Sequence, residues 1–132
     1  MKFEKIDYKN LNAKAKEIYN FQKVSAVLAD YGFTTMWLNN DWQGADFIAV
    51  HIDGLTDLKV QLKGRLSFDM KYVGKDIWIC FIEGDNIYLY PHDEVMNAIP
   101  IIKDAVINNG GRSMSSIPKT HQYILNQYKL EN

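Results

Sequence analysis

The spacing of apolar and polar positions predicts one long amphipathic helix near the start of the chain, over residues 11–31. Its apolar positions recur at helical spacing, at Phe21, Val24 and Leu28. Asn12 is a typical N-cap residue, and Gly32 can follow the last turn in the left-handed conformation. Both ends of this helix are therefore marked in the sequence.

After this helix, alternation of apolar and polar residues predicts several strands. The expected strands cover 33–38, 45–52, 56–63 and the two arms of a hairpin within 75–91. A loop is expected at 39–44 because turn-forming residues gather there. Asp53-Gly54, placed between two alternating runs, predicts a hairpin with a two-residue type I′ turn.

The last third of the chain is expected to be mainly helical. Residues 92–108 predict one or two helices broken at Pro100, and residues 119–130 predict a closing helix. Between them, 108–118 reads as a Gly/Ser-rich loop. The order of a helix, then strands, then helices predicts one α/β (α+β) domain over residues 1–132.

Composition narrows the functional classes. The 132 residues suit one domain, and 47% hydrophobic content can form a core. A net charge of −1 excludes a strongly basic coat, so any anion site must be local. The single cysteine, Cys80, lies in an apolar run and is expected to be a buried hydrophobe. No apolar run approaches a membrane span, so we expect a soluble, cytoplasmic protein with no membrane partner.

The predicted hairpin brings three polar side chains together. If Asp53-Gly54 is the turn, Asp46 lies opposite Gln61, and Lys63 lies two residues further on the same face. The opposite face of the same hairpin is uniformly apolar, with the pairs Ala45 and Leu62, Phe47 and Val60, and Ala49 and Leu58. A carboxylate, an amide and a lysine therefore converge on one end of the hairpin.

That combination suits phosphodiester chemistry. The oxygens of Asp46 and Gln61 can bind Mg²⁺, which usually takes only one or two carboxylates and keeps several waters. Lys63 can stabilise charge on the phosphate or position the attacking water. Glu17 sits at the end of the apolar stripe of the helix, where a carboxylate needs a partner. That partner is either the metal site or a lysine at the protein rim, Lys14 or Lys63.

These residues resemble a known family. "GAD" at 44–46 followed by "QLK" at 61–63 is similar to the PD-(D/E)XK nuclease superfamily, and the Gln-x-Lys form resembles the branch with group I intron homing endonucleases. The resemblance covers a core of about residues 10–100, with 101–132 as a C-terminal helical segment. It departs from the pattern at Ala45, where the family has proline, and at Gln61, where a second acid is usual.

The resemblance implies a restriction-endonuclease-like three-layer α/β/α sandwich with a central mixed sheet. It implies Mg²⁺ as cofactor, with Mn²⁺ as an alternative, and cleavage of phosphodiester bonds. Carried over, Asp46, Gln61 and Glu17 become metal-site residues and Lys63 becomes the catalytic lysine.

Several further residues are candidates for nucleic-acid binding. They offer cations, donors or a ring to a phosphate backbone or base: Arg65, Arg112, Ser113, Lys119 and Trp42. The alternative for the 108–118 segment is a flexible connector. For the lysines of the 56–63 strand, it is a solvated edge strand. Taken singly, Lys71, Lys75, Arg112 and Lys119 are expected to be solubility charges rather than contacts.

The leading hypothesis is a Mg²⁺-dependent endonuclease acting on double-stranded or branched DNA. One site per chain favours a homodimer or a higher homo-oligomer for cutting both strands. A second hypothesis is a catalytically weak or inactive nucleic-acid-binding or interaction module on a nuclease-like scaffold, because Gln61 replaces an acid. A third is a scaffold protein that binds no nucleic acid.

Overall fold

The computed structural model describes residues 1–131, and of residues 41 and 42 it describes the backbone only. The α-helices are α1 (Ala13–Asp30), α2 (His92–Ala98), α3 (Pro100–Asn109) and α4 (Gln122–Leu125). The strands are β1 (Phe33–Trp42), β2 (Ala45–His51), β3 (Asp57–Lys63), β4 (Leu66–Asp69), β5 (Ile77–Glu83), β6 (Asn86–Pro91), β7 (Gly111–Met114) and β8 (Lys129–Leu130). Short 3-10 helices are η1 (Tyr8–Asn10), η2 (Met70–Tyr72), η3 (Lys119–His121) and η4 (Asn126–Tyr128).

Six strands form one mixed sheet in the order β1-β2-β3-β5-β6-β8. The β3–β5 pair is parallel, and the other neighbours are antiparallel. A separate antiparallel ribbon joins β4 to β7. The expected mixed α/β architecture is thus confirmed.

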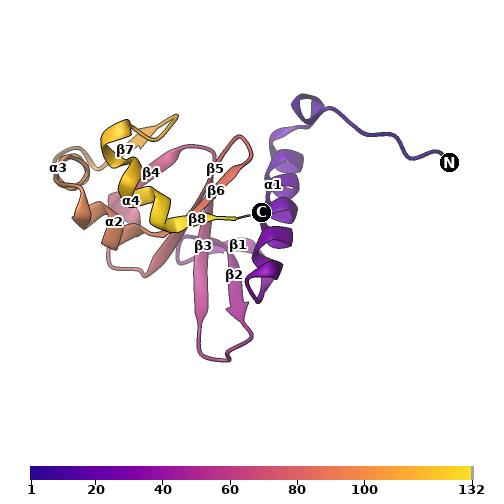
Figure 1. Ribbon diagram of the computed structural model, residues 1–132, viewed down its shortest axis with the longest axis horizontal. Helices are drawn as coiled ribbons and strands as arrows, with labels where there is room; N and C mark the ends of the chain where they lie inside the picture. The colour runs from indigo at the N-terminus through magenta and orange to yellow at the C-terminus, as the bar shows by residue number, and fades with distance from the viewer. Residues whose placement is uncertain (132) are drawn as a thin grey trace.

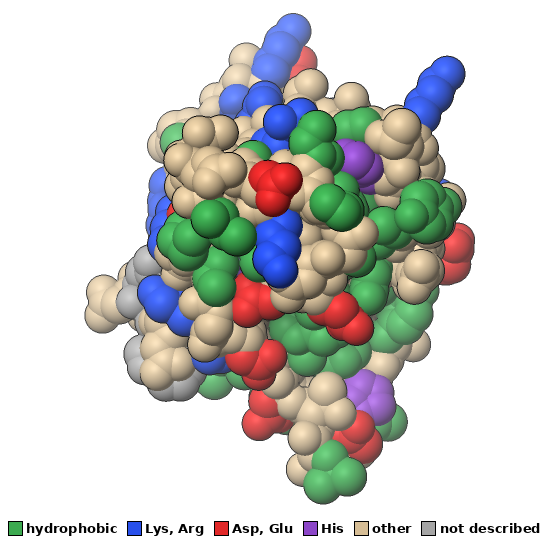
Figure 2. Space-filling model, turned by 90° about the vertical axis from the view of Figure 1, so that its left-hand side faces the viewer, with side chains coloured by type: hydrophobic (Ala, Val, Ile, Leu, Met, Phe, Trp, Pro, Cys, Tyr) green, Lys and Arg blue, Asp and Glu red, His purple; other side chains and the backbone are tan. Residues whose placement is uncertain are grey.

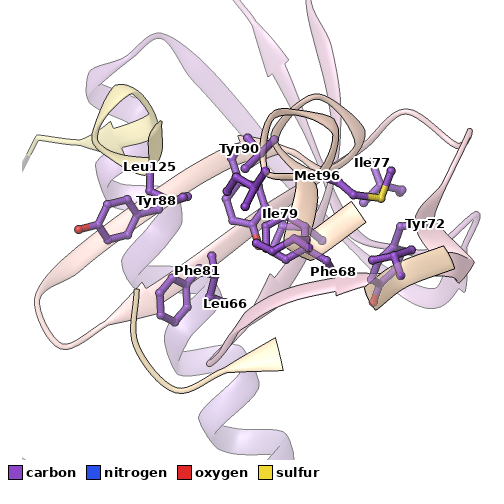
Figure 3. Close-up of a cluster of buried hydrophobic side chains, with 14 of the residues drawn as sticks. Leu66, Phe68, Tyr72, Ile77, Ile79, Phe81, Tyr88, Tyr90, Met96 and Leu125 are labelled. Carbon is purple, nitrogen blue, oxygen red and sulfur yellow. The ribbon is translucent and has the colours of Figure 1, made fainter. Parts of the chain in front are cut away.

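Helices cover both faces of the sheet (Figure 1). On one face, α1 inserts the fully buried Val24 and Leu28 between Phe47, Val60 and other residues that point towards it. On the other face, α2 and α3 pack over the aromatic side of β5 and β6, where Tyr88, Tyr90 and their neighbours are buried (Figure 3). The β1–β2 half of this second face is more open, and Met36 and Val50 remain exposed there.

Both predicted ends of α1 are confirmed. The Asn12 side chain accepts a hydrogen bond from the Ala15 amide at 2.8 Å, which satisfies one free donor of the first turn. Gly32 follows the helix with φ +86°, and its carbonyl accepts a hydrogen bond from the Ile52 amide at 3.0 Å. The helix end is therefore tied directly to the end of β2.

The predicted register of β2 and β3 is confirmed from Phe47 onwards, but the predicted pairs Ala45 with Leu62 and Asp46 with Gln61 are not part of the ladder, and Ala45 packs in the core on the other face. Phe47 pairs with Val60 and Ala49 pairs with Leu58, as the pattern requires.

The predicted turn is wrong. The loop has four residues rather than two, because the His51 amide donates to the carbonyl of Thr56 at 2.9 Å. Within this loop only Gly54 has a positive φ, whereas a type I′ turn needs two. A two-residue loop and a four-residue loop centred on Asp53-Gly54 give the same strand register. The pairs Phe47 with Val60 and Ala49 with Leu58 were therefore predicted correctly although the turn was not.

The type I′ conformation lies instead in the preceding connection. Gln43 and Gly44 have φ of +54° and +86°, and Trp42 pairs with Ala45 across them. The loop expected at 39–44 is therefore wrong, because β1 continues to Trp42. An irregularity in the ladder between Trp37 and Trp42 absorbs the extra residues of β1.

The helix break at Pro100 is confirmed, but the C-terminal region is less helical than predicted. The 108–118 loop contains β7, whose backbone pairs with β4. Instead of one helix, 119–130 holds η3, α4, η4 and the short strand β8, which pairs with β6. Partner strands far away in sequence stabilise these segments, and local composition does not reveal them. Across the described residues, no helix is both long and apolar enough to cross a membrane.

The predicted burial of Cys80 is confirmed, and it predicts a low reactivity of the thiol in the folded protein. Its side chain is fully buried, and burial raises the pKa of the thiol to about 12. We expect the native protein to resist a thiol reagent such as DTNB at about pH 8, and to react completely once unfolded in guanidinium chloride. Native-state labelling at the rate of a small free thiol would contradict this packing.

Candidate active site

The side chain of Asp46 on β2 forms a hydrogen bond to β3 just beyond the last paired residues of these two strands. The backbone ladder of β2 and β3 ends at Phe47 and Val60. Beyond it, the Asp46 carboxylate Oδ2 accepts a hydrogen bond from the Leu62 amide at 2.8 Å. The side chain of Asp46 thus takes the place of a ladder acceptor and lies against the middle residue of the Gln61–Lys63 segment.

The ladder between β1 and β2 is irregular opposite Asp46. The ladder with β1 is regular up to Trp37 and Phe47, and resumes only at Trp42 and Ala45. Asp46 therefore lies opposite a bulge, a feature that re-aims side chains.

Gln61 and Lys63 both lie beside Tyr72 of η2. Gln61 lines a small cavity of about 160 Å³ together with Gly44 and Tyr72. The Lys63 ammonium lies 5.9 Å from the centre of the Tyr72 ring, within cation–π range. Both strand neighbours of β3 are present, so the edge-strand alternative for its lysines is wrong.

Lys59 has a structural role on this face. Its ammonium donates to the Lys75 carbonyl at 2.6 Å and to the Gln43 side-chain oxygen at 3.2 Å. It therefore joins the β1–β2 turn to the loop before β5.

Glu17 is only partly associated with this group. Its carboxylate lies 3.8 Å from the Lys14 ammonium on the same helix, so the lysine-partner alternative is realised with Lys14. It also lines a cavity of about 650 Å³ that Leu62 and Lys63 share. Asp46 and Gln61 do not line that cavity, so the structure joins Glu17 to Lys63 but not to the other two residues.

The donor set for a metal is small. Among the described residues, no group of three or more His, Cys, Asp or Glu side chains is placed to hold a metal ion. Asp46 offers a carboxylate, which accepts from the Leu62 amide, and Gln61, the residue before Leu62, offers an amide oxygen. This pair fits the chemistry of Mg²⁺, which accepts few protein oxygens and completes its shell with water and phosphate.

A cationic groove adjoins Lys63. This groove, of about 500 Å³, is formed by β4, η2 and β7, and four cations line it: Lys63, Arg65, Lys71 and Arg112. Arg65 is held in place because its guanidinium donates to the hydroxyl of Ser113 at 3.2 Å. Asp69 is the single carboxylate among the described lining residues, and it accepts from the Lys71 amide at 2.9 Å. The groove therefore carries a local positive charge on a chain that is nearly neutral overall.

The structure brings together three of the five predicted nucleic-acid residues, Arg65, Arg112 and Ser113. Lys119 starts the three-residue η3 and does not line the groove. The side chain of Trp42 lies outside the described part of the chain. Lys71, expected to be a solubility charge, also lines the groove.

Two buried side chains that the sequence did not single out hold the groove strand. The Tyr90 hydroxyl donates to the Ser67 carbonyl at 2.8 Å and accepts from the Ser67 amide, and burial raises its pKa. His92 Nε2 accepts from the Asp69 amide at 3.0 Å, so its Nδ1 carries the proton and donates to Asp93 at 2.7 Å. The second Asp93 oxygen accepts from the Gly74 amide at 2.8 Å. Together these bonds anchor residues 67–74.

Comparison with known proteins adds one structural likeness. No family model matches the chain, and the search of curated proteins found no match. Among solved structures, the chain is similar to a bacterial homing endonuclease, I-Ssp6803I, with a TM-score of 0.47 and 15% sequence identity. The alignment covers 89% of this chain and 94% of that chain.

The hydrogen bonds of His92 predict that replacing this residue destabilises the protein. In His92→Phe the Asp69 amide loses its buried acceptor, so we expect the free energy of unfolding to fall by about 1–3 kcal/mol. Amide hydrogen exchange at Asp69 and Gly74 should accelerate. Urea denaturation and exchange measured by NMR check both effects. The control His121→Ala replaces a histidine that has no described contact with residues 67–74, and it should stay within about 0.5 kcal/mol of wild type. An equal loss there would contradict a specific role of the His92 hydrogen bonds.

Proposed function

We propose that the protein is a Mg²⁺-dependent endonuclease of the PD-(D/E)XK type that hydrolyses phosphodiester bonds in DNA. The observation that carries the proposal is the hydrogen bond between Asp46 and the Leu62 amide, which joins the acid to the Gln61–Lys63 segment. Lys63, in turn, opens onto the cationic groove. Asp46, as the acid that would bind the metal, is thereby linked through the Gln61–Lys63 segment to Lys63 and to the cationic groove.

Asp46 and Gln61 are the residues that would hold the metal, with Mn²⁺ as an alternative to Mg²⁺. When bound, the ion supplies positive charge to the phosphate and lowers the pKa of water. The Leu62 amide holds one Asp46 oxygen by a hydrogen bond, which orients the carboxylate without neutralising it. The neutral amide of Gln61 contributes an oxygen with no negative charge, so metal affinity is expected to be modest.

Lys63 would stabilise charge on the phosphate as the bond to the leaving oxygen breaks. Its position over the Tyr72 ring keeps the ammonium half-buried, where a charge interacts more strongly than in bulk water. Glu17 reaches the other cavity beside Lys63 and is the more distant candidate, since it pairs with Lys14.

The groove would position the substrate by its backbone. Lys71, Arg65 and Arg112 present charge to phosphates, and phosphate contacts set register without reading sequence. Because each chain carries one such site, cutting both strands of a duplex would use two copies of the chain.

A second candidate function is nucleic-acid binding without catalysis. It is favoured by the absence of a three-ligand acidic cluster among the described residues, combined with the intact cationic groove. Calorimetry with Mg²⁺ separates the two functions. Metal binding that Asp46→Asn removes supports the enzyme, whereas DNA binding without metal binding at millimolar Mg²⁺ supports the binding module.

The catalytic roles predict the outcome of three substitutions. Asp46→Asn keeps an acceptor for the Leu62 amide but loses the charge, and Lys63→Met keeps the apolar stem but loses the ammonium. Each should lower Mg²⁺-dependent cleavage of plasmid, single-stranded or branched DNA by about 100-fold or more. Gln61→Glu adds a charged ligand and should tighten Mg²⁺ binding.

Controls make this outcome specific. Lys103→Met on the exposed side of α3 should leave cleavage unchanged, and all variants should unfold at the same temperature within error. Activity that persists in chelator, or full activity of purified Asp46→Asn, would refute the proposed site.

The groove predicts a change in salt dependence. Lys71→Ala and Arg112→Ala should each weaken DNA binding for all sequences and reduce the slope of log affinity against log salt by about 0.9. Fluorescence anisotropy at several salt concentrations measures this slope. Lys103→Ala, outside the groove, is the matched control; slopes unchanged in both groove variants would exclude the groove from the interface.

A further inference from the structure

Lys63 lines a second cavity besides the cationic groove, and this one is larger. We call it the α1 cavity, because it lies between α1, the end of β3 and the β5–β6 turn. In Figure 1 that turn lies beside the upper half of α1. The volume of about 650 Å³ is within the range of about 300–1,000 Å³ that is typical of small-molecule sites.

The floor of the α1 cavity is apolar. Four aliphatic side chains from α1, β3, β5 and β6 line it: Val27, Leu62, Ile82 and Ile87. All four belong to the core cluster beneath α1 or pack against it, so the packing of helix on sheet fixes their positions. Such a floor favours a ligand that can cover it with an apolar surface.

Two tyrosines form an aromatic wall of the same cavity. The ring centres of Tyr8 and Tyr19 lie 5.2 Å apart. The Asn20 side-chain amide donates to the Tyr8 hydroxyl at 2.9 Å, and the ammonium groups of Lys16 and Lys23 lie 5.4 and 5.3 Å from the two ring centres. Residues of α1 therefore hold both rings in place, while Tyr8 is still 39% exposed. Aromatic rings on a nucleic-acid-binding surface stack with the bases of unpaired nucleotides.

The charges around the α1 cavity are balanced, unlike those around the groove. Among its described lining residues are two lysines and two carboxylates: Lys23, Lys63, Glu17 and Asp85. The groove has four cations against a single described carboxylate. The groove thus favours phosphates, whereas the α1 cavity favours an uncharged group with a hydrogen-bonding edge.

The two cavities are contiguous, because Lys63 and Gly64 line both. In Figure 2 the projecting lower end of the molecule carries hydrophobic and acidic side chains, and the Lys and Arg side chains lie above it. The groove strands β4 and β7 lie in the upper part of the molecule (Figure 1). A phosphate backbone is therefore attracted to the end of the molecule where groove and α1 cavity meet.

We propose that the α1 cavity receives one unpaired nucleobase, next to the phosphate that Lys63 holds. The inference rests on the proposed function, because it takes DNA bound at Lys63 as its fixed point. The base covers the apolar floor, contacts the ring of Tyr8 or Tyr19, and presents its polar edge to Asn20 and Glu17. A paired base must first leave the duplex stack, at an energetic cost. The substrate class is therefore DNA with an unpaired nucleotide at the bound phosphate, as in a single strand, a bulge or a branch.

DNA binding in EDTA tests the cavity in the absence of cleavage. Three probes are compared by fluorescence anisotropy: a duplex, the same duplex with one bulged adenine, and the same bulge with an abasic nucleotide in place of the adenine. Wild type should bind the bulged adenine about 5- to 100-fold more tightly than the abasic bulge, which is the usual effect of stacking one base on an aromatic side chain.

Variants of the wall assign this preference to the cavity. Tyr8→Ala and Tyr19→Ala should each reduce the preference for adenine over the abasic nucleotide and leave binding of the plain duplex unchanged. Tyr8→Phe keeps the ring and should keep the preference. The control Tyr123→Ala removes a tyrosine that is 68% exposed and lies outside the cavity, and it should change no affinity.

Each outcome decides the inference. A base preference that the tyrosine variants reduce, with intact duplex binding and an unchanged melting temperature, supports it. Equal affinity of wild type for adenine and abasic bulges, a preference that survives both alanine variants, or no binding of any probe overturns it.

The nuclease proposal is judged by a different readout, which is Mg²⁺-dependent cleavage and its loss in Asp46→Asn. Cleavage without a base preference leaves the nuclease standing and removes the base site. A base preference without cleavage retains the base site on a binding module and removes the nuclease.

Discussion

The hydrogen bond from the Leu62 amide to the Asp46 carboxylate is the interaction on which the proposed site depends. It forms where β2 stops pairing with β3 and where β1 bulges away from β2. A regular ladder at this position would give the Leu62 amide a backbone acceptor and would leave Asp46 as an ordinary strand side chain. The bulge therefore converts an alternating hairpin into a place where an acid lies beside the Gln61–Lys63 segment.

The cationic groove depends on a different kind of constraint. Its cations lie on β3, β4, η2 and β7, and the ribbon of β4 and β7 is held from beneath by buried polar side chains. Tyr90 fixes the backbone at Ser67, and His92 fixes it at Asp69, with both groups fully buried. Buried polar groups of this kind must be fully satisfied, and here Tyr90 and His92 each bond to the backbone of β4. The aromatic core of the second layer thus supports the surface that would meet phosphate (Figure 3).

Several parts of this arrangement followed from local pattern. The α1 caps, the apolar pairs of β2 and β3 from Phe47 onwards, the break at Pro100 and the burial of Cys80 were all predicted, because each depends on neighbours within a few residues or on one alternating face. The turn type was predicted wrongly at Asp53-Gly54, yet the register survived because a two-residue and a four-residue loop align the strands identically. Among the candidate residues, Arg65, Arg112 and Ser113 meet in one groove, whereas Lys119 lies apart and Glu17 pairs with Lys14.

The sequence by itself determined which residues alternate on β3, so Gln61 and Lys63 share a face opposite Leu58 and Val60. Only the tertiary structure decided what that face meets. The parallel pairing with β5 makes β3 an interior strand, and the pairing of β7 with β4 brings Arg112 close to Lys63 across nearly fifty intervening residues. Neither pairing has a local signal, because backbone ladders between distant strands are selected by the packing of the whole sheet rather than by the residues that form them.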